Sequence, residues 1–155
     1  IAVLGAMFYF QMINSKIQPT QKKEFLVTSD SIVLDLGDGN KEVLSESGNL
    51  VIADKEGQLL GGQNGSMLIY QKQESASNEI AYNTLSVPYG KQFEIQLSDG
   101  SIVHMNAGSS LKYPVHFPKQ GNRQVYLTGE AFFKVQKGKK FTVNTESHSR
   151  VDHTV

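Results

Sequence analysis

The chain has no cysteine among its 155 residues. Disulfide bridges, thiolate zinc sites and cysteine nucleophiles are therefore excluded, although the redox compartment stays open. Neither sign of charge is in excess, because 15 basic and 15 acidic residues cancel. No positive field is available to hold a phosphate backbone, so we expect no nucleic-acid binding.

The sequence also lacks the short motifs of common active sites. It contains no Gly-x-Ser-x-Gly elbow, no His-Glu-x-x-His pair and no phosphate loop with its lysine. His104 and His116 lie in separate segments, and His148, Asp152 and His153 lie in a polar tail without a matching ligand pair. We expect no catalytic residue, no cofactor and no metal site, and hence no enzyme.

A full membrane-spanning run is absent, but residues 1–13 are apolar apart from Gln11. A helix needs about 20 apolar residues to cross the hydrocarbon core. The run can be the C-terminal part of a cut transmembrane helix, the remnant of a signal peptide or a buried helix. We favour the first, because the run stops at polar residues, and the chain lacks an initiator methionine, as a piece of a longer polypeptide would. Residues 14–29 then form a juxtamembrane linker, and the rest lies beyond the bilayer.

From residue 30 onwards, apolar and polar residues alternate with a period of two, which predicts short strands. Turn residues separate them, as in Gly37-Asp38-Gly39-Asn40 and Ser98-Asp99-Gly100-Ser101. We interpret residues 61–65 as a flexible turn. A polar connection at 71–82 divides a β-rich lead-in, residues 30–72, from a second β domain, residues 82–145. The predicted class is all-β, with a sandwich, a roll or a β-solenoid as the arrangement.

Four stretches of the second half resemble the FecR family. The most specific one is Leu127-Thr128-Gly129-Glu130-Ala131-Phe132-Phe133, within 125–135. The others are 82–90, with Val87-Pro88-Tyr89-Gly90, then 97–101, and 105–114, with Asn106-Ala107-Gly108-Ser109 and Tyr113-Pro114. Order and spacing agree with the family, so the chain resembles the periplasmic sensor region of a FecR-type anti-sigma factor.

The resemblance implies a β-roll or short right-handed β-solenoid, with a β-sandwich as the alternative. It also implies a single-pass inner-membrane protein whose periplasmic part reads occupancy of a TonB-dependent outer-membrane transporter. The expected partners are the transporter's periplasmic signalling domain, site-specific proteases, and an extracytoplasmic-function sigma factor bound by a cytoplasmic segment outside this chain. The alternative function is a non-catalytic carbohydrate-binding β-module.

The residues of the family motifs have a structural role in the simplest interpretation. Asn106 suits a turn, where its amide bonds to neighbouring backbone. Glu130 can be a recognition carboxylate, although a charged residue in a hairpin is the plainer expectation. Tyr113, Tyr126, Phe132 and Phe133 are expected in the core or half-buried on strands. The full set of motif residues is Asp99, Gly100, Asn106, Ser109, Tyr113, Pro114, Gly129, Glu130 and Phe133.

Two departures from the family pattern have structural consequences. Position 104 is histidine where tryptophan is frequent, which predicts a less apolar strand. After residue 145 the sequence continues as a polar tail, residues 146–155, instead of another apolar strand. We expect an unpaired sheet edge and a tendency to associate.

Overall fold

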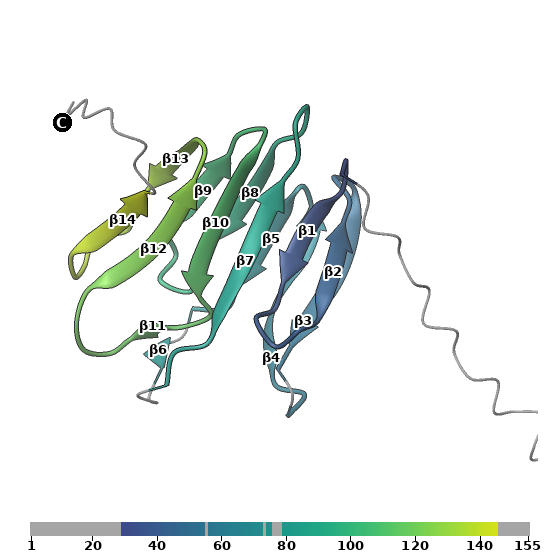
Figure 1. Cartoon of the computed structure of the whole chain (residues 1–155). Coiled ribbons are helices and arrows are strands. Elements are labelled where there is room, and N and C mark those ends of the chain that lie inside the picture. The colour runs from purple at the N-terminus through teal and green to yellow at the C-terminus, as the bar shows by residue number, and fades with distance from the viewer. Residues whose placement is uncertain (1–28, 55, 73, 76–78, 146–155) are drawn as a thin grey trace, which may run out of the picture.

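Two six-stranded sheets lie face to face in the computed structural model, which describes residues 29–54, 56–72, 74–75 and 79–145 (Figure 1). The first sheet has the order β14 (Phe141–Thr145), β12 (Arg123–Thr128), β10 (Ser109–Pro114), β7 (Tyr82–Val87), β1 (Ile32–Asp35) and β2 (Lys41–Leu44). The second has the order β13 (Ala131–Lys134), β9 (Ile102–Met105), β8 (Phe93–Gln96), β5 (Met67–Tyr70), β4 (Leu59–Gly65) and β3 (Gly48–Ala53). Two short strands, β6 (Glu74–Ser75) and β11 (Phe117–Pro118), pair in parallel at one end.

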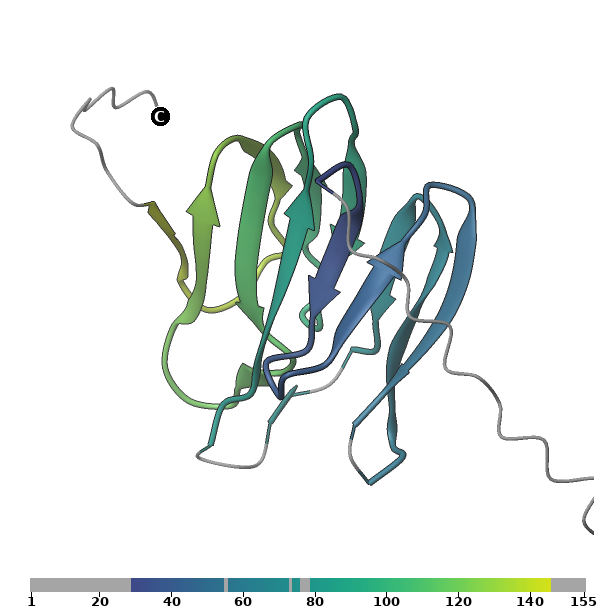
Figure 2. The same ribbon diagram turned by 45° about the vertical axis from the view of Figure 1, so that its right-hand side comes forward.

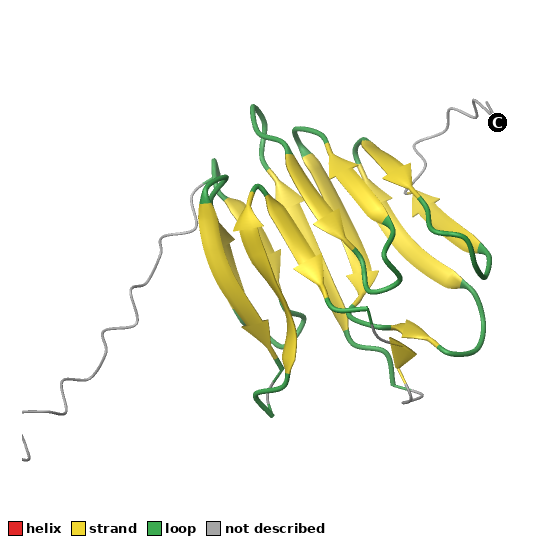
Figure 3. Ribbon diagram, turned by 180° about the vertical axis from the view of Figure 1, so that it is seen from behind, coloured by secondary structure: helices red, strands yellow, loops and turns green. Residues whose placement is uncertain are grey.

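The all-β prediction is confirmed, and no helix occurs among the described residues (Figure 3). Most neighbouring strands are antiparallel, while β5 with β8 and β12 with β14 are parallel. The chain crosses repeatedly from one sheet to the other, as in a roll. Figure 2 shows two stacked layers, which is the sandwich that we gave as the alternative arrangement. Successive coils of a solenoid would instead place neighbouring strands parallel, whereas most neighbours here are antiparallel.

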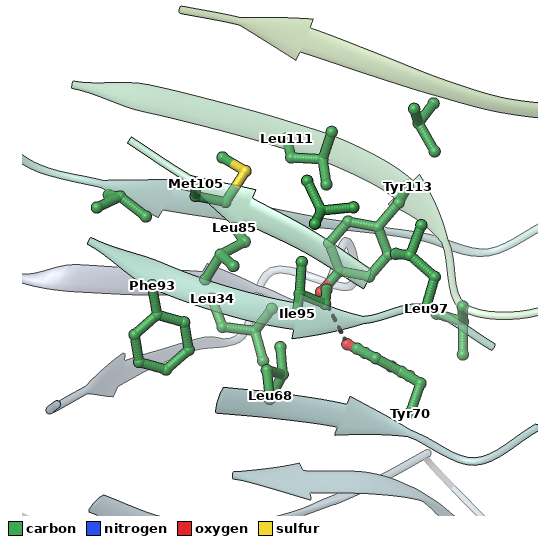
Figure 4. Close-up of a cluster of buried hydrophobic side chains, with 14 of the residues drawn as sticks. Leu34, Leu68, Tyr70, Leu85, Phe93, Ile95, Leu97, Met105, Leu111 and Tyr113 are labelled. Carbon is green, nitrogen blue, oxygen red and sulfur yellow. Dashed lines mark hydrogen bonds between the residues drawn. The ribbon is translucent and has the colours of Figure 1, made fainter. Parts of the chain in front are cut away.

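The alternating sequence places one side of each strand in the core. Residues of β7 alternate between intermediate and buried, and residues of β12 alternate between buried and exposed. Leu85, Ile95 and Leu111 are completely buried between the sheets (Figure 4). Burial of apolar side chains from both inner faces is the main stabilising term of such a two-layer fold.

Both predicted hairpin turns form, and an aspartate organises each of them. Asp38 accepts a hydrogen bond from the backbone N–H of Asn40 at 2.9 Å. Asp99 accepts one from the N–H of Ser101 at 2.8 Å. A side-chain acceptor two residues back mimics a backbone turn, which explains why Asp precedes Gly at both corners.

The prediction of a flexible turn at residues 61–65 is wrong, because these residues lie in β4. Glycine is needed there for a different reason. A Cβ on Gly61 would lie 2.2 Å from the Ile69 carbonyl oxygen, and one on Gly62 would lie 2.6 Å from that of Leu50. The neighbouring backbones approach too closely for any side chain, so glycine permits the pairing of β4.

The lead-in and the second β domain share both sheets. Strand β1 pairs with β7, and β5 pairs with β8. The polar connection at 71–82 therefore separates two parts of the sequence, but strands from the two parts hydrogen-bond to one another within the same sheets. The predicted transmembrane segment and linker, residues 1–28, and the polar tail, residues 146–155, lie outside the described residues, and the domain boundaries stay a prediction.

Candidate interaction surface

Asp99 and Gly100 lie at the end of the molecule where β8 turns into β9. Gly100 has a φ of +85°, which glycine adopts without strain. The Asp99 carboxylate accepts hydrogen bonds from the Ser101 hydroxyl at 2.8 Å and from an Arg123 NH1 group at 2.5 Å. The turn is thus joined to β12 of the opposite sheet.

Arg123 extends this connection to the turn that leads from β13 of the second sheet to β14 of the first. Its Nε donates to the carbonyl oxygen of Lys139 at 2.9 Å, and its guanidinium lies 5.3 Å from the centre of the Phe141 ring. The side chains of Arg123 and Asp99 are 8% and 11% exposed. The motif aspartate therefore has a buried cationic partner, which our sequence analysis did not identify because the two residues are 24 positions apart.

Asn106, Ser109, Gly129 and Glu130 meet at the opposite end. The Ser109 hydroxyl donates to the carbonyl oxygen of Glu130 and accepts from its N–H, each at 2.8 Å. The N–H of Asn106 donates to the same carbonyl at 3.1 Å. The structure uses the backbone of Glu130 to join β9, β10 and β13, and its side chain is exposed.

Tyr113 belongs to a polar network inside the core. Its hydroxyl lies 3.0 Å from that of Tyr70, and the rings meet edge to face at 75° (Figure 4). The Asn83 amide is oriented so that its oxygen accepts from Tyr70 at 2.6 Å and its nitrogen donates to the Leu36 carbonyl at 3.0 Å. Burial raises the pKa of Tyr113 well above its ordinary value of 10.0, with the nearby Tyr70 as a second cause.

Pro114 and Phe133 complete the motif residues. Pro114 is the last residue of β10 and is buried opposite Tyr82. Phe133 is half-buried on β13, with its ring 6.0 Å from that of Phe141. The nine residues do not converge on one site, since they lie at both ends of the sandwich and in its core. Their structural role stays a prediction.

Motif residues and their neighbours also build an outward face on the second sheet, which we call the β8–β9–β13 face. It consists of two rows, of which the first, Gln92, Asn106 and Glu130, directly flanks the three strands and the second, Glu94, His104 and Phe132, lies within them. The side chain of Gln92 donates to Asn106 at 3.2 Å, beside Glu130. One step down each strand, Glu94, His104 and Phe132 face one another.

The second row carries the most exposed aromatic ring on a strand of the described structure. Phe132 is 68% exposed, so our expectation that it lies in the core or half-buried is wrong. Alternation along β13 turns Phe133 inward and therefore Phe132 outward. His104 lies 3.0 Å from Glu94, and its ring is 5.9 Å from that of Phe132. The side chain of His104 also faces outward, which explains why a polar histidine is tolerated at this position.

On the outer face of the first sheet, Tyr82 and Tyr126 flank Lys112. The Lys112 ammonium lies 5.2 Å and 6.0 Å from the two ring centres. Tyr126 is exposed, at 42%, so our expectation that it lies in the core or half-buried is wrong for this residue too. The rings are inclined at 64°, so they do not present the single flat face on which a sugar ring would stack.

Two hollows open at the end that carries the Asp99 turn. One has a volume of about 510 Å³ and is lined by Lys72, Asp99, Arg123 and Lys137 among others. The other, of about 830 Å³, is rich in carboxylates, namely Asp35, Asp38, Asp54, Glu56 and Glu79. No three His, Asp or Glu residues within the described ranges are grouped so that they could hold a metal ion.

A comparison with protein families gave a match for the second half of the chain. A family model described as FecR protein matches residues 83–152, which begin within β7 and continue through β14 past the last described residue. Residues 83–152 belong to the FecR family. The FecR region thus contains all nine motif residues and the β8–β9–β13 face.

FecR proteins are regulatory rather than catalytic, and the domain indicates a signalling role of the anti-sigma-factor type. Members are typically inner-membrane proteins. In the part of the chain that the structure covers, no helix has the length and apolarity needed to span a bilayer. Neither curated proteins nor solved structures gave a match to the chain.

Proposed function

We propose that the chain is the periplasmic signal-sensing part of a single-pass anti-sigma factor. In this role it relays the occupancy of a TonB-dependent outer-membrane transporter to an extracytoplasmic-function sigma factor. The observation that supports the proposal best is the FecR match over residues 83–152. The apolar run at residues 1–13 precedes the β-rich part, as a membrane anchor would.

A sensor of this kind needs a rigid scaffold and an exposed recognition surface. The core network around Tyr113 and the tie between Asp99 and Arg123 supply rigidity. The β8–β9–β13 face supplies a surface with an exposed aromatic residue, Phe132, surrounded by polar groups. Aromatic residues within a polar rim are frequent at protein interfaces. The transporter's periplasmic signalling domain is the partner that we propose for this face, and site-specific proteolysis would then release the sigma factor.

A reporter assay in cells tests the proposed function. The intact protein is expressed with its sigma factor and transporter, and the output of a sigma-dependent promoter is measured with and without the inducing ligand. Deletion of residues 83–145 is expected to abolish regulation. Unchanged regulation after that deletion would contradict a signalling role for the FecR domain.

Phe132→Ala tests the docking face within the same assay. We expect it to reduce induction while the protein accumulates normally, because an exposed side chain contributes little to folding. Val51→Ala is the matched control, since Val51 is 73% exposed on the outer face of the same sheet but lies on β3, at the opposite edge. Equal induction in the two variants would exclude the β8–β9–β13 face as the docking surface.

A further inference from the structure

The two sheets have four edge strands, β2, β3, β13 and β14, and three of them carry features that discourage pairing with another chain. Strand β2 carries the charges of Lys41 and Glu42. Strand β3 has a register irregularity between Ile52 and Ala53. Strand β13 is four residues long and ends at Lys134. Charges, bulges and short length are the usual protections of an exposed sheet edge.

Strand β14 has none of these protections. Its sequence, Phe141-Thr142-Val143-Asn144-Thr145, contains no charge and no proline. It pairs with β12 over five residues in an unbroken parallel register, so no bulge twists the edge away. Among the described strands, nothing pairs with its other side. A regular, uncharged edge presents free backbone donors and acceptors in the geometry that a further strand requires.

The side chains beneath this edge are also incompletely covered. Phe141 and Val143 point toward the core but are only half-buried. Across the register they lie beside Arg123 and Val125 of β12, which are buried. The Phe141 ring contacts the rings of Phe117 and Phe133 at 6.0 Å each. The sandwich therefore ends in an apolar cluster that one more strand would cover.

We propose that a second copy of this chain occupies the edge, with β14 of the two copies paired antiparallel about a two-fold axis at Val143. In this register Val143 faces Val143 of the second copy, Phe141 faces Thr145, and Thr142 faces Asn144. The two apolar residues of each copy lie on the core side, and the polar pairs lie on the outside. The first sheets of the two copies would join into one continuous sheet.

The self-complementary sequence of β14 is the reason for choosing a second copy as the occupant. An isologous interface requires each residue to meet an acceptable partner from the same segment. Val143 meets Val143, the polar Thr142 meets the polar Asn144, and Phe141 meets Thr145, whose methyl group can pack against the ring, while no charges oppose one another. A single strand pair buries little surface, so the dimer is expected to be weak and dependent on concentration. This pairing is independent of the regulatory role proposed above.

A disulfide test uses the absence of cysteine from the chain. Val143→Cys places one thiol opposite its counterpart, because directly opposed residues of an antiparallel pair have Cβ atoms about 4.5 to 5.5 Å apart. The full chain, kept in detergent because residues 1–13 are apolar, is oxidised mildly and the covalent dimer is measured. Val51→Cys is the control, since Val51 is 73% exposed and would cross-link more readily in random collisions. We expect Val143→Cys to form severalfold more dimer, and an equal or larger yield from Val51→Cys would overturn the proposal.

Sedimentation velocity provides a second measurement that requires no change in the core. The unmodified chain should show a dimer fraction that rises with concentration. Thr142→Lys adds a charge to the outer side of the edge and should return the protein to a monomer, whereas Thr128→Lys, on the exposed side of β12, should leave the dimer fraction unchanged. A monomer at every concentration would overturn the proposal and point to residues 146–155 or another protein as the cover of β14.

Discussion

Arg123 and Asp99 form a buried ion pair that connects β12 of the first sheet to the β8–β9 turn of the second. The pair is accompanied by hydrogen bonds to the Ser101 hydroxyl and the Lys139 carbonyl. Such additional partners decide whether a buried charge is tolerated, because both ions lose their hydration on folding. At the residue scale, this fold is therefore sensitive to the loss of either partner.

Arg123→Met tests this sensitivity. The substitution leaves the Asp99 carboxylate buried beside an apolar side chain, and removal of one partner of a buried pair costs about 3 to 5 kcal/mol of unfolding free energy. Urea unfolding of the full chain measures the loss. Lys137→Met, in the exposed turn after β13, is the control and should change stability by less than about 0.5 kcal/mol. Similar losses in the two variants would show that the ion pair has no special role.

The buried tyrosines predict a loss of stability at alkaline pH. Burial raises the pKa of both Tyr70 and Tyr113 above 10.0, so the folded protein retains protons that the unfolded chain releases. Their contribution is complete below pH 10.0 and is lost as the pH rises from that value toward the raised pKa values of the folded state.

Urea unfolding at about pH 8 and about pH 11 measures this effect. Tyr113→Phe should be less stable than the unmodified chain at the lower pH, by about 1 kcal/mol for one lost hydrogen bond. It should also lose less stability between the two pH values. An identical loss in the variant would mean that Tyr113 does not cause the alkaline sensitivity.

The turn between β12 and β13 shows how an element depends on one glycine. Gly129 has a φ of +92°, and a Cβ there would lie 2.6 Å from the Ser109 hydroxyl and 2.9 Å from the Ser109 Cα. Because Ser109 is held by two hydrogen bonds to Glu130, it cannot move aside without breaking the connection between β10 and β13. The turn requires both the left-handed backbone and the empty space.

Gly121 allows these two requirements to be separated. Its φ is +94°, nearly that of Gly129, but a Cβ on it would meet no atom within 4 Å. Gly121→Ala should cost about 1 kcal/mol for the backbone conformation alone. Gly129→Ala should cost about 3 kcal/mol, since the steric conflict is added. Thermal unfolding compares the two variants, and equal midpoints would contradict a packing role for Gly129.

At the scale of the whole molecule, the FecR region and the lead-in depend on each other. Seven of the twenty residues in the buried hydrophobic cluster come from residues 30–72. Without the lead-in, β7 and β8 would each lose a neighbouring strand, and the inner faces of both sheets would be exposed. The portion matched by the family model therefore lacks a complete core of its own.

Truncation tests this dependence directly. We follow thermal unfolding by circular dichroism. A chain that begins at residue 73 should show no cooperative transition, because β7 and β8 are left as exposed apolar edges. A chain that begins at Ser29 retains every described strand and should unfold cooperatively. Cooperative unfolding of the shorter chain would show that residues 82–145 fold independently.

The family strings could be recognised from the sequence because they are local, but their spatial relation could not. The sequence predicted Asp99 and Gly100 as a turn correctly, since the signal lies within four residues. It did not reveal Arg123 as the partner of Asp99, Asn83 as part of the Tyr113 network, or Phe132 as exposed. Each of these depends on which strand lies beside which, or on which side of a strand faces the other sheet.

The sequence by itself determined the strand-rich class, the Asp-Gly turns and the family strings, because alternation and turn chemistry act over a few neighbouring residues. The tertiary structure decided that Gly61 and Gly62 lie within a strand, that Phe132 faces outward, and that Arg123 is the partner of Asp99. These outcomes follow from contacts between residues distant in the chain, for which the local pattern carries no information.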